Sequence, residues 1–208
     1  EEVQAQRETR AKVSGEPVQE ARASTTDPEA RNMKFPNGGY GPGHNVQFCT
    51  DVASGIIVGV DVTNAGSDAE EFPPMLEQLE RRYARTPAEG LVDGGFATKE
   101  AINIAQAQGC TVYAPLKDEA KQRAAGKDPF AKKKGDTTAV ANWRQRMGTE
   151  AAQTIYKLRA QTAEWVNAIA RNRGFYTLPV RGLVKCRAVA ALYAITHNIV
   201  QGAKLRAA

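Results

Sequence analysis

The pattern of apolar and polar positions changes period along the chain, and it begins with a two-residue alternation. Val46, Phe48 and Thr50 alternate with polar residues over 44–52, and a mostly apolar, β-branched run follows at 56–62. Two such segments joined by a short turn predict a β-hairpin in which one strand is well buried.

Helical spacing and short strands alternate through the middle of the chain. Apolar residues recur at helical intervals over 75–83. A short apolar run that ends at Asp93 predicts a strand, and the segments 98–109 and 110–115 predict a helix and another strand. Alternating strands and helices behind a hairpin favour an α/β fold, with a mixed sheet and helices on its faces.

Two helical patterns close the chain. From residue 150, Ile155, Leu158, Thr162, Trp165 and Ile169 follow one another at steps of three and four. After an interruption by Gly and Pro, a second apolar pattern of this kind covers 183–203. Both patterns predict helices.

Composition divides the chain into four parts. Residues 1–31 contain three sizeable apolar residues, all Val, and are predicted to form a polar N-terminal arm. Residues 32–116 carry the predicted α/β core. Residues 117–149 are polar, basic and poorly periodic, which indicates an insertion or a second arm. Residues 150–208 add the C-terminal helices that complete the domain.

Size and composition exclude several classes of protein. A chain of 208 residues with 42% hydrophobic and 25% charged residues suits one globular domain, with or without arms. No window approaches 18 consecutive apolar residues, so we expect no membrane span. Three widely spaced Cys residues without a C-x-x-C pair argue against a disulfide framework and fit a reducing cytosol.

The charge is unevenly distributed. Residues 117–146 contain nine Lys or Arg and four acids, a net +5, and residues 151–208 contain nine basic residues and one acid, a net +8. Because the whole chain carries +5, the remainder carries −8. An acidic front and a basic back favour a polyanionic partner, nucleic acid first, although a solvated basic surface is the simpler interpretation.

Two carboxylates are candidates for chemistry. Asp93 ends a short strand and precedes a Gly-Gly pair, where α/β folds place catalytic groups; taken alone, the pattern favours an Asp that supports the strand–helix turn. Glu164 is the only acid beyond residue 150, and a divalent cation is one possible partner in so basic a region. The alternative interpretation is that Glu164 forms surface ion pairs with Lys157 and Arg171 on the same helix face.

Five blocks of sequence, in chain order, carry a family resemblance. They are TDPEARNMK, GYGPGHNVQFCTDVASGIIVGVDVTNAGSD, LVDGGF, YKLRAQTAEWVNAIARNRGF and VRGLVKCRAVAALYAITHNIV. Together they resemble bacterial insertion-sequence transposases of the DDE class, from about Thr25 to about Ala203. The resemblance implies a ribonuclease-H-like fold, with a mixed sheet flanked by helices, and phosphoryl transfer on DNA.

The resemblance also implies site residues. In such transposases three carboxylates hold two divalent metal ions, usually Mg²⁺, with Mn²⁺ as the alternative. Asp93 matches the second carboxylate and Glu164 the third, so both are candidate catalytic and metal-binding residues. Tyr156, Arg159, Glu164 and Arg171 resemble a Tyr–Arg–Glu–Lys signature. Arg171 stands where Lys is usual, and the interval from Arg159 to Glu164 is one residue longer than usual.

The first carboxylate of such a site has no clear match in this sequence. It would lie on a central strand of the sheet, which needs an apolar run that residues 1–31 do not offer. We therefore expect this Asp upstream of Glu1, with Asp27 as a fallback. The fold would then lack its first strand, and residues 1–208 alone would not cleave DNA with Mg²⁺.

The implied function is metal-dependent cleavage and strand transfer in DNA transposition. The partner would be double-stranded DNA, at the element ends and at the target, bound by a homodimer in the bacterial cytoplasm at the nucleoid. Tyr156, Arg159 and Arg171 would bind DNA, together with three lysines of the basic segment, Lys132, Lys133 and Lys134. The alternatives are a ribonuclease-H-like nuclease without strand transfer and an inactive remnant that only binds DNA.

Overall fold

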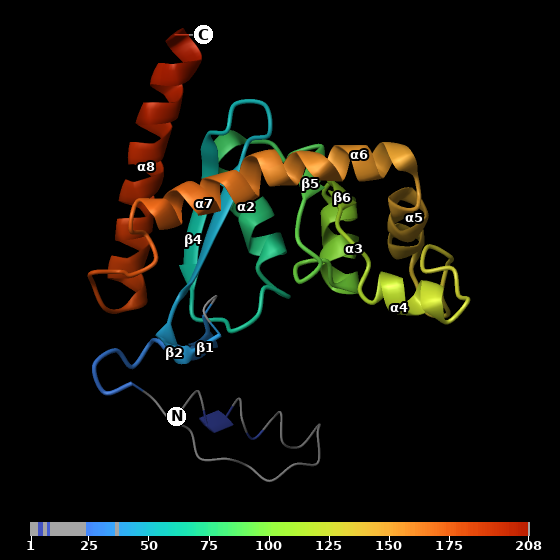
Figure 1. The fold of residues 1–208 in the computed structure, drawn as a ribbon, viewed down its shortest axis with the longest axis horizontal. Helices are drawn as coiled ribbons and strands as arrows, with labels where there is room; N and C mark the ends of the chain where they lie inside the picture. The colour runs from blue at the N-terminus through green and yellow to red at the C-terminus, as the bar shows by residue number, and fades with distance from the viewer. Residues whose placement is uncertain (1–3, 6–7, 9–23, 36–37, 208) are drawn as a thin grey trace.

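The computed structural model describes residues 4–5, 8, 24–35 and 38–207, so the arm predicted at 1–31 lies mostly outside the described residues. Its strands and helices are shown in Figure 1. In chain order they are β1 (Arg31–Lys34), β2 (Tyr40–Gly43), β3 (Asn45–Thr50), β4 (Ile57–Thr63), α2 (Phe72–Tyr83), β5 (Glu89–Leu91), α3 (Lys99–Ala107), β6 (Thr111–Tyr113), α4 (Glu119–Ala124), α5 (Thr138–Met147), α6 (Glu150–Arg159), the π-helical segment η1 (Ala160–Glu164), α7 (Trp165–Asn172) and α8 (Leu183–Ala207).

The predicted hairpin is confirmed as the antiparallel pair β3–β4, with Phe48 opposite Val60. The outer edge of β4 is covered by side chains instead of a strand. The Gln78 amide of α2 bonds both the N–H and the C=O of Val60 at 3.0 Å, and Asn198 of α8 does the same for Ile57 at 2.8 Å. These amides satisfy an edge that could otherwise pair with another chain.

The second sheet is the parallel pair β5–β6, with Gly90 opposite Val112. Around it lies the largest core cluster, formed by β6 with α2, α3, α5 and α6. Gly90 has to be glycine here, because an added Cβ would lie 2.9 Å from the Phe72 ring. The Thr98 side chain caps α3 by accepting a hydrogen bond from the amide of Ala101.

Four elements were not predicted, namely β1, β2, α4 and α5. Residues 40–43, expected to be part of a Gly/Pro loop, form β2 and pair with β1. Within the basic segment 117–149, expected to be an insertion or arm, α5 buries Val140 and Trp143 in the main core. The second half of that segment is therefore part of the folded domain, and only its first half remains polar and exposed.

Helices α6 and α7 run end to end through η1, which confirms the long helix predicted from residue 150 (Figure 1). Beside them, α8 packs against β4 through a face that includes the buried residues Cys186, Ala190 and Ala194. By length and composition, α8 is also the one helix in the described part of the chain that could cross a membrane. One face of α8 packs against β4, whereas only 22% of its most apolar window is buried.

The architecture as a whole is mixed α/β, with several helices around three two-stranded sheets. The single mixed sheet that the sequence predicts is divided, because β3–β4 and β5–β6 are not joined by strand pairing among the described residues. The outer edge of β3 carries no strand there, in contrast with the covered edge of β4.

Candidate active site

Asp93 lies directly after β5, at the carboxyl end of the strand. The amide of Val92 still bonds the carbonyl of Tyr113 at 3.0 Å, and the chain then turns, with the amide of Gly94 donating to Asp93 Oδ1 at 2.6 Å. A side chain at Gly94 would approach the backbone carbonyl of Pro115. The turn thus holds one carboxylate oxygen and leaves the Asp93 side chain 59% exposed.

Glu164 is placed by the π-helical segment. It lies five residues after Arg159, and on a regular α-helix five residues leave two side chains about 140° apart. Residues 160–164 instead form η1, whose wider turn brings residues five apart onto one face. Arg159 Nη1 donates to Glu164 Oε1 at 2.7 Å. The interval from Arg159 to Glu164, which is one residue longer than usual, is therefore accommodated by η1, and Glu164 still faces Arg159.

Arg159 joins the two candidate carboxylates. Its Nη2 lies 3.8 Å from Asp93 Oδ2, while Nη1 is paired with Glu164. Its side chain is 18% exposed, against 59% for Asp93 and 57% for Glu164. The guanidinium therefore lies beneath two carboxylates that face solvent, although the residues are 71 positions apart in sequence.

Tyr156 belongs to the same cluster. It lies three residues before Arg159 on α6, so both side chains are on one face of the helix. Burial raises the pKa of the Tyr156 hydroxyl, and the nearby Asp93 and Glu164 raise it as well, whereas the charge and hydrogen bond of Arg159 lower it. The phenol stays a neutral hydrogen-bonding group at neutral pH, suited to an anionic oxygen.

The other candidate residues lie elsewhere. Arg171 is exposed in the last turn of α7. Lys132, Lys133 and Lys134 lie between α4 and α5, where the Lys133 ammonium contacts Gln122 of α4. The structure does not join these four residues to the cluster at Asp93.

Asp27, the fallback for the first carboxylate, has a structural position. Its Oδ2 accepts hydrogen bonds from the Gly182 amide and pairs with His44 Nε2, both at 3.0 Å. Glu29 accepts from the amide of Leu183 at 3.0 Å. These carboxylates satisfy free amides at the start of α8. The hydrogen bond from Gly182, and then that from His44, lowers the pKa of Asp27.

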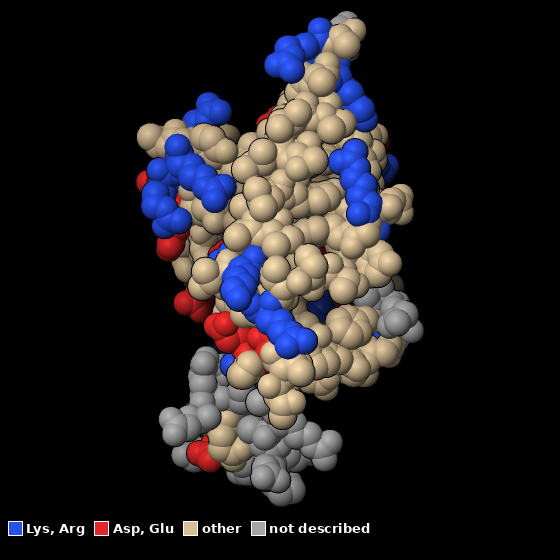
Figure 2. All heavy atoms as spheres, turned by 90° about the vertical axis from the view of Figure 1, so that its left-hand side faces the viewer, with Lys and Arg blue, Asp and Glu red and all other residues tan. Residues whose placement is uncertain are grey.

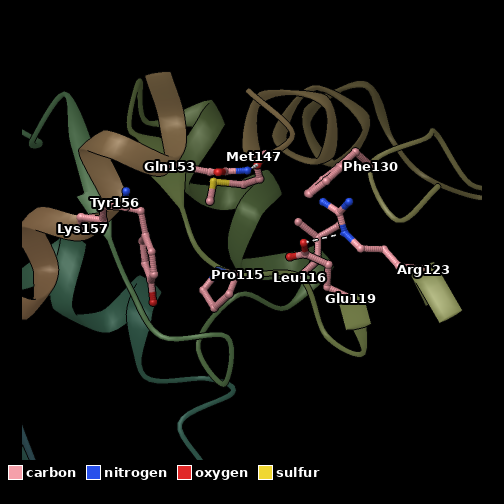
Figure 3. Close-up of a pocket in the computed structure, with 9 residues that line it drawn as sticks. All are labelled: Pro115, Leu116, Glu119, Arg123, Phe130, Met147, Gln153, Tyr156 and Lys157. Atoms are coloured by element: carbon pink, nitrogen blue, oxygen red, sulfur yellow. Dashed lines mark hydrogen bonds and ion pairs between the residues drawn. The ribbon is translucent and has the colours of Figure 1, made fainter. Parts of the chain in front are cut away.

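A cavity of about 370 Å³ opens beside the cluster and shares Tyr156 with it. Figure 3 shows Tyr156 and Lys157 on one side of this cavity, with Arg123 and Phe130 on the other. Pro115, whose carbonyl lies next to the Gly94 turn, forms part of its wall. Aromatic and apolar groups, Lys157 and the ion pair of Arg123 with Glu119 thus line a hollow that shares Tyr156 with the candidate site.

Comparison with known proteins supplies a family. Residues 97–203, just over half of the chain, match the model of a family described as a transposase DDE domain. The chain belongs to the DDE transposase family. No curated protein and no solved structure matches it. Members of this family generally use divalent metal ions and act on DNA. The matched region includes Glu164 and Arg159, while Asp93 precedes it by four residues.

The donor groups of this transposase domain fit a divalent cation in part. Asp93 and Glu164 offer oxygen ligands, which Mg²⁺ and Mn²⁺ prefer, and both are open to solvent. The described residues contain no cluster of three or more His, Cys, Asp or Glu side chains that could hold a metal ion. Two carboxylates can share such an ion with water molecules, but a two-metal site needs further ligands.

Sequence reasoning missed the link through Arg159 and the role of Asp27. Arg159 was expected to bind DNA, yet it also pairs with both carboxylates. The spacing gave no signal of this pairing, because five residues on a regular α-helix would separate the two side chains, and only η1 brings Glu164 to Arg159. Asp27 carried no signal either, because its contacts to Gly182 cross 155 residues of sequence.

Proposed function

We propose that this chain is the catalytic part of a bacterial insertion-sequence transposase. It would cleave DNA at the element ends and join the 3′ ends to target DNA, in the cytoplasm at the nucleoid. The observation that carries the proposal is the convergence of Asp93 and Glu164 on Arg159 in a chain of the DDE transposase family.

In this proposal Asp93 and Glu164 hold the divalent ion through their exposed oxygens. When bound, such an ion activates the attacking hydroxyl and stabilises the leaving oxygen of a phosphodiester. Tyr156 and Arg159 lie beside the carboxylates and orient the phosphate by hydrogen bonds. Arg171 and the three lysines Lys132, Lys133 and Lys134 supply phosphate contacts further along the DNA.

The proposed fold is ribonuclease-H-like, with a further strand that joins the two divided sheets. The edge of β4 is already closed by Gln78 and Asn198, so the strand would pair along β3. An apolar strand in this place would also bring the first carboxylate of the site. Residues 1–208 alone are then expected to bind metal weakly and to leave supercoiled plasmid intact in Mg²⁺.

Metal binding tests the site directly. Titration of Mn²⁺ followed by calorimetry should show binding that Asp93→Asn and Glu164→Gln each weaken about tenfold or more, because each removes a charged ligand. Glu77→Gln, an exposed position on α2, is the matched control and should bind as the unaltered chain does. Equal affinities for all four proteins would refute the site.

The homodimer in this proposal forms through the outer face of α8. Exposed apolar side chains follow one another along it at helical spacing, namely Val184, Leu192, Ile195, Ile199 and Leu205. Figure 2 shows an uncharged band along the middle of this side, with Lys and Arg at its upper end, on its flanks and across its lower part. No charged residue lies between Arg187 and Lys204.

A second copy of the chain fits this face by shape and symmetry. A 25-residue helix is about 37 Å long and about 10 Å wide, so two such faces cover about 740 Å² in flat projection, in the range of weak, transient interfaces. In a dimer with two-fold symmetry, this patch of one copy contacts the same patch of the other copy. The basic residues at both ends repel across such a dimer, so added salt should strengthen it.

Sedimentation tests the dimer. Leu192→Glu combined with Ile195→Glu should leave monomers, whereas Val52→Glu, an exposed apolar position on the β3–β4 turn, should not. Monomers at every concentration, or binding of the unaltered α8 face to lipid vesicles instead, would refute the dimer and leave the metal site untouched.

The second candidate function, an inactive remnant that only binds DNA, is favoured by one observation. The described residues hold two converging carboxylates and no third. A remnant would bind DNA and fail to cleave it even with an added Asp-bearing strand, whereas the transposase would then cleave in Mg²⁺. A nuclease would cleave but would not join the 3′ end to a second duplex.

A further inference from the structure

Arg159 occupies an unusual position for a residue expected to bind phosphate. Its guanidinium is directed at two carboxylates, with Nη1 2.7 Å from Glu164 and Nη2 3.8 Å from Asp93. It is mostly buried, whereas both acids are mostly exposed. The side chain cannot serve these carboxylates and a DNA phosphate with the same hydrogen bonds.

The charges make Arg159 a competitor of any cation at this place. A divalent ion shared by Asp93 and Glu164 would lie within a few ångströms of the guanidinium, where two positive charges repel strongly even at the dielectric of a protein surface. The ion and Arg159 would also claim the same carboxylate lone pairs. Occupancy by metal therefore weakens the ion pairs of Arg159.

The location of Arg159 offers it another anion. It ends α6, next to Tyr156, and the cavity that Tyr156 lines has a second cation, Lys157, at its border. A side chain released from the acids could stay on this face of the helix and reach a phosphate held there. Arginine suits both states, because its fork binds carboxylates and phosphates alike.

We propose that Arg159 couples metal binding to DNA binding: it pairs with Asp93 and Glu164 until a divalent ion displaces it, and it then binds a phosphate. The proposal rests on the metal site proposed above. Coupling of this kind is reciprocal, so DNA must tighten metal binding by the same factor by which metal tightens DNA binding.

The first test is Mn²⁺ titration by calorimetry with Arg159→Gln. Removal of the competing charge should raise Mn²⁺ affinity about tenfold, whereas Arg171→Gln, the matched loss of a charge on α7, should change it little. Arg159→Lys, which keeps the charge but loses the fork, should fall between them. Circular dichroism checks that each variant is folded.

The second test measures duplex DNA binding by fluorescence anisotropy, with and without Ca²⁺ at constant ionic strength. Ca²⁺ should tighten binding several-fold for the unaltered chain and for Arg171→Gln, and should have little effect on Arg159→Gln. Unchanged or weaker Mn²⁺ binding by Arg159→Gln would refute the coupling and leave the metal site standing. If no variant binds Mn²⁺, or if the Mn²⁺ binding that is measured is unaffected by Asp93→Asn, the metal site and the coupling are refuted together.

Discussion

Asp136 shows that a carboxylate in a basic segment can be structural. Its side chain is fully buried between Lys99, at 2.9 Å, and Arg144, at 2.8 Å, and it also accepts from the amide of Lys133. These contacts tie the loop before α5 to α3. Burial opposes the charge of Asp136, but the hydrogen bonds from Lys99, Lys133 and Arg144 outweigh it and hold the pKa at about 2.

Asp136→Asn should destabilise the domain by about 3 kcal/mol, because it leaves two cations beside a neutral amide. Urea unfolding measures the change, with the exposed Glu77→Gln as control. Since the pKa of Asp136 is lowered on folding, its contribution is complete above about pH 4 and is lost as the pH falls towards 2. An acid transition identical in the variant and the unaltered chain would contradict this role.

Asp27→Ala should lower the free energy of unfolding by about 1–2 kcal/mol and leave Mn²⁺ affinity unchanged. The loss arises because the Gly182 amide at the start of α8 loses its acceptor and His44 loses its partner. Unfolding and metal titration on the same variant separate the two roles. A fall in Mn²⁺ affinity as large as that for Asp93→Asn would instead make Asp27 a ligand.

At the scale of elements, the sequence predicted most helices and strands but not how they join. The alternation at 44–52 and the spacing from residue 150 suffice for the hairpin and the long helix, because periodicity reports one buried face. Helix α5 was missed although Thr137 caps it and Val140 and Trp143 lie at helical spacing, because the charges of the segment dominated its interpretation.

The candidate site was predicted only in part, because its residues come from segments that lie far apart in the sequence. The family resemblance predicted Asp93 and Glu164 in one site but not their link through Arg159, which depends on the turn after β5 and on the π-helical segment η1. Contacts such as those of Asn198 with Ile57 join residues 141 positions apart and leave no trace in local periodicity.

Deletion of Gln161 should convert η1 to regular α-helix and preserve the ion pair of Arg159 with Glu164. The pair would then be four residues apart, which also places both side chains on one face. Insertion of one Ala after Ala160 should instead turn Glu164 away and weaken Mn²⁺ binding as Glu164→Gln does. Thermal unfolding and calorimetry compare the two variants. Equal loss of metal affinity in both would show that η1 does not set the geometry.

At the scale of the molecule, exposed basic residues lie on segments outside the candidate site. The segment between α4 and α5 carries Lys132, Lys133 and Lys134, and the exposed end of α7 carries Arg171. The cavity beside Tyr156 is bordered by Lys157 and, on the side of α4, by Arg123, which is paired with Glu119 at 3.0 Å. The test of the proposal is whether DNA bound at the candidate site also contacts the three lysines.

Replacement of Lys132, Lys133 and Lys134 by Ala should weaken binding to duplex DNA and reduce its dependence on salt. Each lost phosphate contact removes about 0.9 from the slope of log K against log salt concentration, so the triple variant should lose up to about 3. Arg81, Arg82 and Arg85 of the α2 region, replaced together, remove the same charge from another surface and are the matched control. If both triple variants lower the slope equally, net charge alone drives binding; a slope changed only by the lysines shows that DNA contacts the segment between α4 and α5.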